Sequence, residues 1–322
     1  MRVLVTGATG FLGAHLVDAL ERRGHAIRAF ARATSRTEAL EARGVEVVRG
    51  AFDRPDTLEP AVDGIDAVVH AAGGGIVKRM ADMYRSNADS TAHLAEAASR
   101  AGVTRFVLVS SLAAHGGARE GRPATESDPD APRSHYGKSK LAAERALARH
   151  ADRMATSVLR PPALYGPGEH RMVGLFRAAE RGFVPMVHPR GTTSMLHGAD
   201  CAEVCARALD SERGHGVLYV AEPAPYARRR MAELIGEAVG KRVRVVGIPV
   251  PLLRAVGTAS DWVGALRDRP VMLGRDKVRD IACPHQSCDP AAAMAALDWE
   301  PAHTLGNSAR ETYRDYQRRG WL

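Results

Sequence analysis

Three glycines near the start of the chain constrain its fold more than any other feature. Residues 2–5 are short, apolar and rich in β-branched side chains, which predicts a strand. Residues 6–13, TGATGFLG, follow without a spacer, and an amphipathic helical pattern begins at residue 12. Glycines let a backbone turn approach a ligand closely, and free N–H groups at a helix N-terminus attract phosphate. A strand, a glycine turn and a helix in this order predict a dinucleotide-binding loop.

The spacing of the glycines differs from the common G-x-G-x-x-G fingerprint, so the loop alone also fits an ordinary corner between a strand and a helix. Its position between the predicted strand and helix favours the dinucleotide. The residues expected to contact the cofactor from this loop are Gly7, Thr9, Gly10, Phe11, Leu12 and Gly13.

Strand and helix patterns alternate along the first half of the chain. Apolar segments predict further strands at 26–30, 45–48, 67–69, 105–109 and 156–159, with helical stretches between them. This alternation is typical of an α/β protein with a Rossmann-like, doubly wound parallel sheet, which binds ligands at the carboxyl ends of its strands.

The alternation breaks after residue 168, where helical pieces mix with short strands and proline turns. We therefore expect a smaller α+β substrate-binding lobe over the strand ends. Residues 1–165 with 192–222 are assigned to the Rossmann domain, and residues 166–191 with 223–322 to the lobe. The apolar face at 248–266 is expected to pack inside this lobe rather than to rest on a membrane.

Composition narrows the class of protein. A hydrophobic content of 45% and a charged content of 25% are ordinary for a globular chain. The net charge of +8 comes from scattered arginines, and aromatic residues make up only 5%, so we expect no nucleic-acid partner. Because the glycine loop begins at Gly7, we expect no signal peptide, and no apolar run reaches the ~18 residues of a membrane span. We expect a cytoplasmic protein that acts on a small molecule and has no membrane segment.

The four cysteines do not form a metal-binding pattern. Cys201 with Cys205 and Cys283 with Cys288 both lack the C-x-x-C spacing, and the first pair falls on the apolar side of a helical pattern. Reduced thiols in the core explain them better than a zinc site, and we expect no metal.

The end of the second predicted strand bears on the choice of cofactor. An NAD-specific site places a carboxylate there to bind the ribose hydroxyls, whereas this chain has Ala31 and Arg32, with no carboxylate before Glu38. A guanidinium at this position would bind a 2′-phosphate, so the sequence favours NADP(H) over NAD(H). The alternative is a solvated arginine.

A tyrosine and a lysine four residues apart indicate proton-transfer chemistry. Tyr136 and Lys140 share one helical face. A tyrosine titrates near pH 10, and an adjacent ammonium favours its phenolate, so the pair can exchange a proton with a carbonyl or alcohol oxygen. Ser111, at the end of a predicted strand, would hold that oxygen, and Asn87 would join the relay through water. The pattern is frequent by chance and gains meaning from its order after the glycine loop.

Together these residues resemble the extended short-chain dehydrogenase/reductase family, of the NAD(P)-dependent epimerase/dehydratase type. The resemblance runs nearly end to end and covers TGATGFLG at 6–13, HAAG at 70–73, Asn87, Ser110-Ser111, Tyr136 with Lys140, 160–168, 197–200, LDWEP at 297–301 and the helix at 305–318. It implies a catalytic triad of Ser111, Tyr136 and Lys140. It also implies cofactor contacts from Ala71, Ala72, Gly73, Tyr136, Lys140, Pro161 and Ala163, and a homodimer through helices at 80–101 and 136–150.

Three departures from the family pattern bear on the substrate. Ala51 follows Gly50 where the family carries an adenine-contacting Asp, and Asp53 is a candidate replacement. Ala163 stands where nucleotide-sugar enzymes carry Asn, and residues 193–197 lack their Arg-Asp-Phe-like run. The last two favour the branch that resembles 3β-hydroxysteroid dehydrogenases and dihydroflavonol reductases.

The sequence therefore predicts an NADP(H)-dependent oxidoreductase that interconverts a ketone and a secondary alcohol on a medium-sized, largely apolar substrate. Its pocket is expected from residues 73–83, 112–117, 133–135 and 163–190, in which apolar and small side chains dominate. The alternatives are a nucleotide-sugar epimerase or dehydratase with retained NAD(P), and a non-catalytic NADP(H)-sensing protein. The presence of the whole triad disfavours the last of these.

Overall fold

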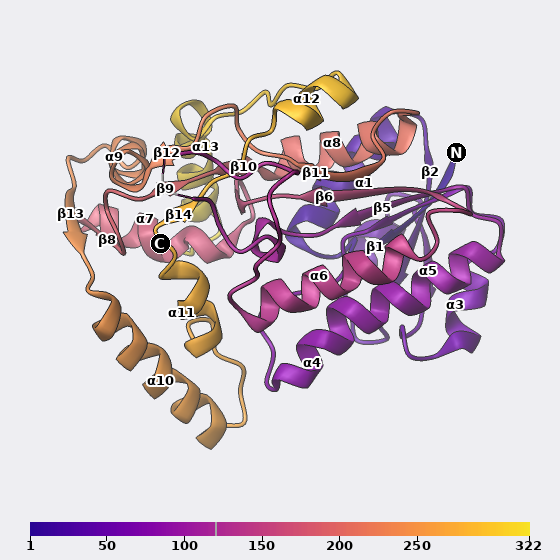
Figure 1. The fold of residues 1–322 in the computed structure, drawn as a ribbon, viewed down its shortest axis with the longest axis horizontal. Helices are drawn as coiled ribbons and strands as arrows, with labels where there is room; N and C mark the ends of the chain where they lie inside the picture. The colour runs from indigo at the N-terminus through magenta and orange to yellow at the C-terminus, as the bar shows by residue number, and fades with distance from the viewer. Residues whose placement is uncertain (120) are drawn as a thin grey trace.

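A parallel sheet forms the centre of the molecule (Figure 1) in a computed structural model that describes residues 1–119 and 121–322. Its seven strands lie in the order β11-β6-β5-β4-β1-β2-β3, and every neighbouring pair is parallel. The strands are β1 (Arg2–Thr6), β2 (Ala26–Ala31), β3 (Glu46–Arg49), β4 (Ala67–His70), β5 (Arg105–Val109), β6 (Ala155–Arg160) and β11 (Gly216–Tyr219). The order reverses between β1 and β4, so the predicted doubly wound, Rossmann-like fold is confirmed.

Helices cover both faces of this sheet. One face packs against α1 (Phe11–Arg22), α8 (Gly198–Asp210) and α12 (Ala291–Leu297). The other packs against α3 (Pro55–Val62), α5 (Ser90–Arg100) and α6 (His135–Ala148). Strand β1 shows why its sequence is continuously apolar: Val3 and Val5 enter the first core, and Leu4 enters the second. Short α2 (Glu38–Glu41) leads into β3.

The four cysteines are buried and free, which confirms the prediction of core thiols. Cys201 and Cys205 lie on the side of α8 that faces the sheet, within the first core.

The remaining elements surround a third core beyond the carboxyl edge of the sheet. Helices α7 (Val173–Glu180), α9 (Arg228–Ala238) and α13 (Leu305–Arg318) pack around Phe176, Ile235 and Tyr316. Three small sheets accompany them: β7 (Ala163–Tyr165) with β10 (Met195–His197), β8 (Phe183–Met186) with β13 (Arg244–Gly247), and β9 (Thr192–Thr193) between β12 (Tyr226–Ala227) and β14 (His285–Gln286). The domain boundaries given above stay a prediction.

Two helices, α10 (Val250–Leu266) and α11 (Arg275–Ile281), form a hairpin that projects from this part of the molecule (Figure 1). The expectation that residues 248–266 pack inside the lobe is wrong for most of α10. Only Leu253, Gly257 and Gly264 are buried among its residues, because α11 covers just one side of the helix. No helix in the described residues is long and apolar enough to cross a bilayer.

The helix expected at 80–101 is interrupted. It consists of α4 (Met80–Tyr84), a π-helical turn at Arg85–Asp89 and α5. A π-turn inserts extra backbone into a helix and is common at functional sites. Here it contains Asn87, whose buried side chain bonds to neighbouring segments instead of facing solvent.

A buried histidine makes the fold sensitive to acid. His70 ends β4 with its Nδ1 atom 2.7 Å from the Thr6 hydroxyl, and burial lowers its pKa from 6.5 to about 3. Because the folded-state pKa lies below the unfolded one, this stabilisation is present above pH 6.5 and is lost as the pH falls toward 3.

We predict that between pH 7 and pH 5 the wild type loses about 2 kcal/mol more unfolding free energy than His70→Gln, which keeps a polar side chain without titrating. Urea unfolding of both proteins at the two pH values measures this. Equal losses would contradict the buried neutral histidine.

Candidate active site

The carboxyl ends of β1, β4, β5 and β6 lie along one edge of the sheet, and most of the predicted site residues follow them. Thr6 links two of these ends, because its hydroxyl contacts His70 at 2.7 Å and accepts the N–H of Ala72 at 3.1 Å. The turn after β1 and the turn after β4 are thereby held together.

Two glycines in the first turn are required by backbone packing. Gly7 has φ +75°, and a Cβ there would lie 2.9 Å from the Ala71 carbonyl and the Ala72 nitrogen. A Cβ on Gly13 would lie 2.2 Å from the Gly7 oxygen. Gly10 differs, because only the Gly7 oxygen approaches its Cβ position, at 3.3 Å. This contact is tight but less severe than the other two, and Gly10 is exposed, so a phosphate can approach its backbone.

The geometry of this turn fits a dinucleotide. Helix α1 begins directly after Gly10, and no side chain among residues 1–119 and 121–322 caps its N-terminus. The free N–H groups and the helix dipole are suited to a pyrophosphate. Thr9 and Gly10 are exposed, and Phe11 and Leu12 are partly exposed.

Other predicted cofactor residues lie along the same edge. Ala71 and Ala72 are partly exposed after β4, and Arg32 is exposed directly after β2. Within the described part of the chain, the Arg32 guanidinium has no hydrogen-bond or ion-pair partner. After β6, the Pro161 carbonyl accepts the Leu112 N–H at 2.9 Å, and exposed Ala163 begins β7.

The structure brings Ser111, Tyr136 and Lys140 together from two elements. Ser111 follows β5 and accepts the Ala113 N–H at 3.2 Å. Tyr136 lies in the first turn of α6, and Lys140 one turn further. The Lys140 Nζ atom donates to the Val109 carbonyl at 3.0 Å, so α6 is bonded to the end of β5 just before the serines.

Burial sets the protonation of this group. It lowers the pKa of the Lys140 ammonium from 10.5 to about 8, against the attraction of Glu144. Burial also raises the pKa of the Tyr136 phenol above its ordinary value, and interactions with Ser111 and the Arg171 guanidinium offset part of that rise. The expected lowering of this pKa by Lys140 does not follow from the chain alone, because Lys140 directs its ammonium to Val109.

Asn87 is fully engaged. Its amide Nδ2 donates to the Gly74 carbonyl at 3.1 Å and to the Ser139 hydroxyl at 2.9 Å, while its Oδ1 accepts the Gly74 N–H at 3.0 Å. A Cβ on Gly73 would collide with Oδ1 at 2.4 Å. Asn87 thus fixes the turn after β4 against α6, which is a positioning role.

A buried charge network lies behind the triad, and sequence reasoning did not identify it. The Arg160 guanidinium donates to the Glu144 carboxylate at 3.0 Å and 2.5 Å, and to the Asp130 carboxylate at 2.7 Å and 2.9 Å. The Ser110 hydroxyl donates a hydrogen bond to the Glu144 carboxylate. These bonds connect α6 to β5 and β6.

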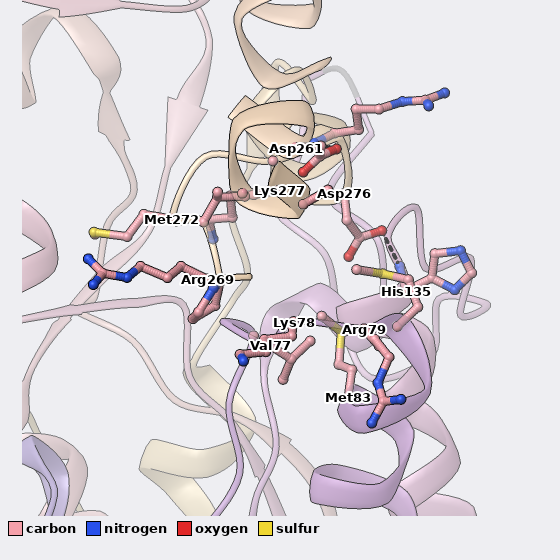
Figure 2. Close-up of a pocket in the computed structure, with 18 of the residues that line it drawn as sticks. Val77, Lys78, Arg79, Met83, His135, Asp261, Arg269, Met272, Asp276 and Lys277 are labelled. Carbon is pink, nitrogen blue, oxygen red and sulfur yellow. Dashed lines mark hydrogen bonds between the residues drawn. The ribbon is translucent and has the colours of Figure 1, made fainter. Parts of the chain in front are cut away.

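A second missed residue, Asp276, comes from α11. Its carboxylate accepts the backbone N–H of His135 at 2.7 Å (Figure 2) and also that of Tyr136 at 3.1 Å. A carboxylate on the first N–H groups of a helix satisfies donors that lack partners within the helix. Asp276 is one of three acidic residues among the many basic ones of residues 267–281, and nothing in this pattern indicates its partner.

A cavity of about 570 Å³ opens between this helix start and the α10–α11 hairpin (Figure 2). One wall includes Val77, Met80, Met83 and His135, as predicted. It reaches Tyr136 through Gly75, where a Cβ would lie 3.1 Å from the phenol ring.

The opposite wall of this cavity corrects the sequence prediction. It comes from residues 261–279 and not from 112–117 or 163–190. The cavity as a whole is also more polar than expected, since its lining includes the charged residues Lys78, Arg79, Asp261, Asp268, Arg269, Arg275, Asp276, Lys277 and Arg279.

The profile of the NAD dependent epimerase/dehydratase family matches residues 3–221, more than half of the chain. The chain belongs to this family. It is accordingly an NAD(P)-dependent oxidoreductase of the extended short-chain dehydrogenase/reductase type, and the resemblance noted in the sequence is confirmed.

Two curated relatives of this epimerase/dehydratase family member and one solved structure extend the comparison. A ceramide reductase of Caulobacter vibrioides is 32% identical over 99% of this chain and 96% of its own length. A 3 beta-hydroxysteroid dehydrogenase/Delta 5-->4-isomerase of Mycobacterium tuberculosis is 33% identical over 81% of this chain and 74% of its own. The structure of a Thermus thermophilus UDP-glucose 4-epimerase in complex with NAD has a TM-score of 0.76 and 26% identity, and it covers 98% of this chain and 99% of its own.

We predict that Asp276→Asn destabilises the protein by about 1 kcal/mol, because the start of α6 loses its charged acceptor. Asp268→Asn in the same hairpin is the matched control, since its carboxylate is 87% exposed and pairs with the exposed Lys78. Urea unfolding compares the two. An equal effect of both substitutions would show that the contact with α6 is not responsible.

Proposed function

We propose that this protein is an NADP(H)-dependent ketoreductase that interconverts a ketone and a secondary alcohol on a medium-sized, largely apolar substrate. One observation carries the proposal. Ser111, Tyr136 and Lys140 converge at the carboxyl edge of the sheet, and the Tyr136 ring lies against Gly75, which lines the cavity. The names of the curated relatives, a ceramide reductase and a hydroxysteroid dehydrogenase, support the same chemistry.

The triad residues have separate roles in this proposal. When bound, the cofactor donates a hydride to the carbonyl carbon or accepts one from the alcohol. The Ser111 hydroxyl donates a hydrogen bond to the substrate oxygen, and the Tyr136 hydroxyl gives that oxygen its proton. Because burial raises the pKa of Tyr136, the phenol holds its proton at neutral pH, which suits reduction. Lys140, protonated below its pKa of about 8, bonds α6 to the end of β5 and so keeps Tyr136 beside Ser111.

The glycine loop supports the cofactor assignment. Gly10 is exposed at the uncapped N-terminus of α1, and the close backbone contacts at Gly7 and Gly13 hold the turn that carries it. Exposed Arg32 at the end of β2 is the proposed ligand of the 2′-phosphate. Ala71, Ala72 and Gly73 follow β4 at the same edge of the sheet, and their small size leaves the cofactor room there.

The cavity supports an amphipathic substrate. Val77, Met80, Met83, Val271 and Met272 provide apolar surface, while cationic side chains at the rim meet a polar group. Those cations also favour one second candidate, a nucleotide-sugar epimerase, because a diphosphate needs several convergent donors. The two are distinguished by cofactor absorbance. Net oxidation or reduction of added cofactor supports the ketoreductase, and turnover of a sugar nucleotide without it supports the epimerase.

We predict that Tyr136→Phe lowers kcat for ketone reduction by about 10²- to 10⁴-fold and leaves NADPH affinity nearly unchanged, since only the proton donor is removed. Tyr313→Phe is the control, because its hydroxyl bonds to Glu180 on the far side of the third core. Steady-state kinetics and fluorescence titration give the two quantities. Unchanged turnover in Tyr136→Phe would refute the proton-donor role.

We predict that Arg32→Ala weakens NADPH binding by about one to two decades, the value of a charge-assisted contact worth ~1.5–3 kcal/mol. NADH, which lacks the 2′-phosphate, is the internal control and keeps its affinity. Titration of NADPH and NADH into the wild type and into Arg32→Ala measures the change in the affinity of each cofactor. Equal NADPH affinity in the two proteins would remove Arg32 from the cofactor site.

A further inference from the structure

The outer side of α10 is apolar and uncovered. Leu252, Val256, Val263 and Leu266 repeat at helical spacing and are all exposed, and Leu266 reaches 86% exposure. Trp262 lies beside them with 72% of its surface exposed. A helix that is apolar on its outer side normally packs against another apolar phase. We call these five residues the α10 face.

The opposite, inner side of α10 makes the contacts that hold the hairpin together. It packs on α11 through Leu253 and Val278, which form a small core with Val187. Asp261 is used at this contact too, because its carboxylate accepts the Arg275 N–H at 3.0 Å. The α10 face is therefore extra to what the hairpin needs for its own packing.

Cations surround the α10 face. Arg254, Arg267 and Arg269 are exposed on the helix and on the turn that follows it, and exposed Arg79 lies across the cavity. The one exposed acid in that turn, Asp268, is paired with Lys78 at 2.7 Å. An apolar stripe with an aromatic residue and bordering arginines has the chemistry of a helix that lies in the interface of an anionic bilayer.

The α10 face is continuous with the candidate active site. An apolar groove of about 440 Å³ lies between it and the turn before α11, lined by Val256, Val263, Val271 and Met272. Val271 and Met272 also line the cavity beside Tyr136. A molecule that leaves a lipid phase at the α10 face can thus reach the cavity along apolar side chains.

We propose that the α10 face docks on an anionic lipid surface and delivers an apolar substrate from it to the cavity. Docking stands on the geometry of the hairpin alone, and delivery rests on the proposed ketoreductase function. This replaces the expectation that the protein has no membrane partner. A two-fold contact between copies of the chain would instead bring Arg254, Arg267 and Arg269 against the same residues, and this like-charge contact disfavours a second copy as the occupant.

Vesicle sedimentation of the whole protein tests docking. With vesicles of mixed phosphatidylcholine and phosphatidylglycerol we expect binding that falls by about tenfold in a Trp262→Ser/Leu266→Ser variant and in an Arg254→Glu/Arg267→Glu variant. Phosphatidylcholine alone is expected to bind weakly. Phe183→Ser is the control, because Phe183 is an exposed apolar residue on β8, outside the hairpin.

Two further measurements keep the outcomes distinct. Circular dichroism and reduction of a water-soluble ketone are expected to be unchanged in the docking variants, since none of the four substituted residues lines the cavity. If neither the wild type nor the variants reduce the ketone, but the wild type binds vesicles, the proposed function is refuted and docking is supported. Wild type that stays in the supernatant, or that forms a dimer abolished by Trp262→Ser/Leu266→Ser, would overturn docking.

Discussion

A buried arginine holds together the parts of this structure that carry its candidate chemistry. Arg160 ends β6, and its guanidinium binds Glu144 on α6 and Asp130 in the loop that leads to α6. Two carboxylates without this partner would make the region costly to bury. With it, α6 is fixed against β5 and β6, and the bond from Lys140 to Val109 adds a second connection one turn away. The positions of Tyr136 and Ser111 follow from these bonds.

The protonation of the site also depends on this arrangement. Arg160 compensates Glu144, so the acid one turn from Lys140 raises the lysine pKa less than burial lowers it. The tyrosine is likewise kept neutral by burial. The chain by itself thus holds a phenol ready to donate, and the charge that would make it a base must come from the bound cofactor. The sequence, in contrast, predicted that Lys140 alone favours the phenolate of Tyr136.

The sequence was sufficient to predict the features that depend on neighbouring residues along the chain. The central strands β1, β4 and β5 are mostly apolar because both faces are buried, and Gly7 and Gly13 are required by contacts within one turn and its neighbour. The sequence was insufficient where function depends on contacts between distant segments. Asp276 lies 140 residues from the N–H of Tyr136 that it binds. The apolar pattern of α10 has the same period whether the helix is buried or exposed, so the tertiary neighbours alone decide its environment.

The bond from Asp276 to the start of α6 has a thermodynamic consequence. The hairpin that carries the α10 face also supplies the acceptor for the His135 and Tyr136 N–H groups, so displacement of the hairpin leaves two donors without a partner beside the reacting phenol. A lipid surface that bound the hairpin only in the position where Asp276 reaches α6 would therefore also favour order at the tyrosine. By reciprocity, whatever stabilises the ordered start of α6, including a filled cavity, strengthens attachment at the hairpin by the same factor.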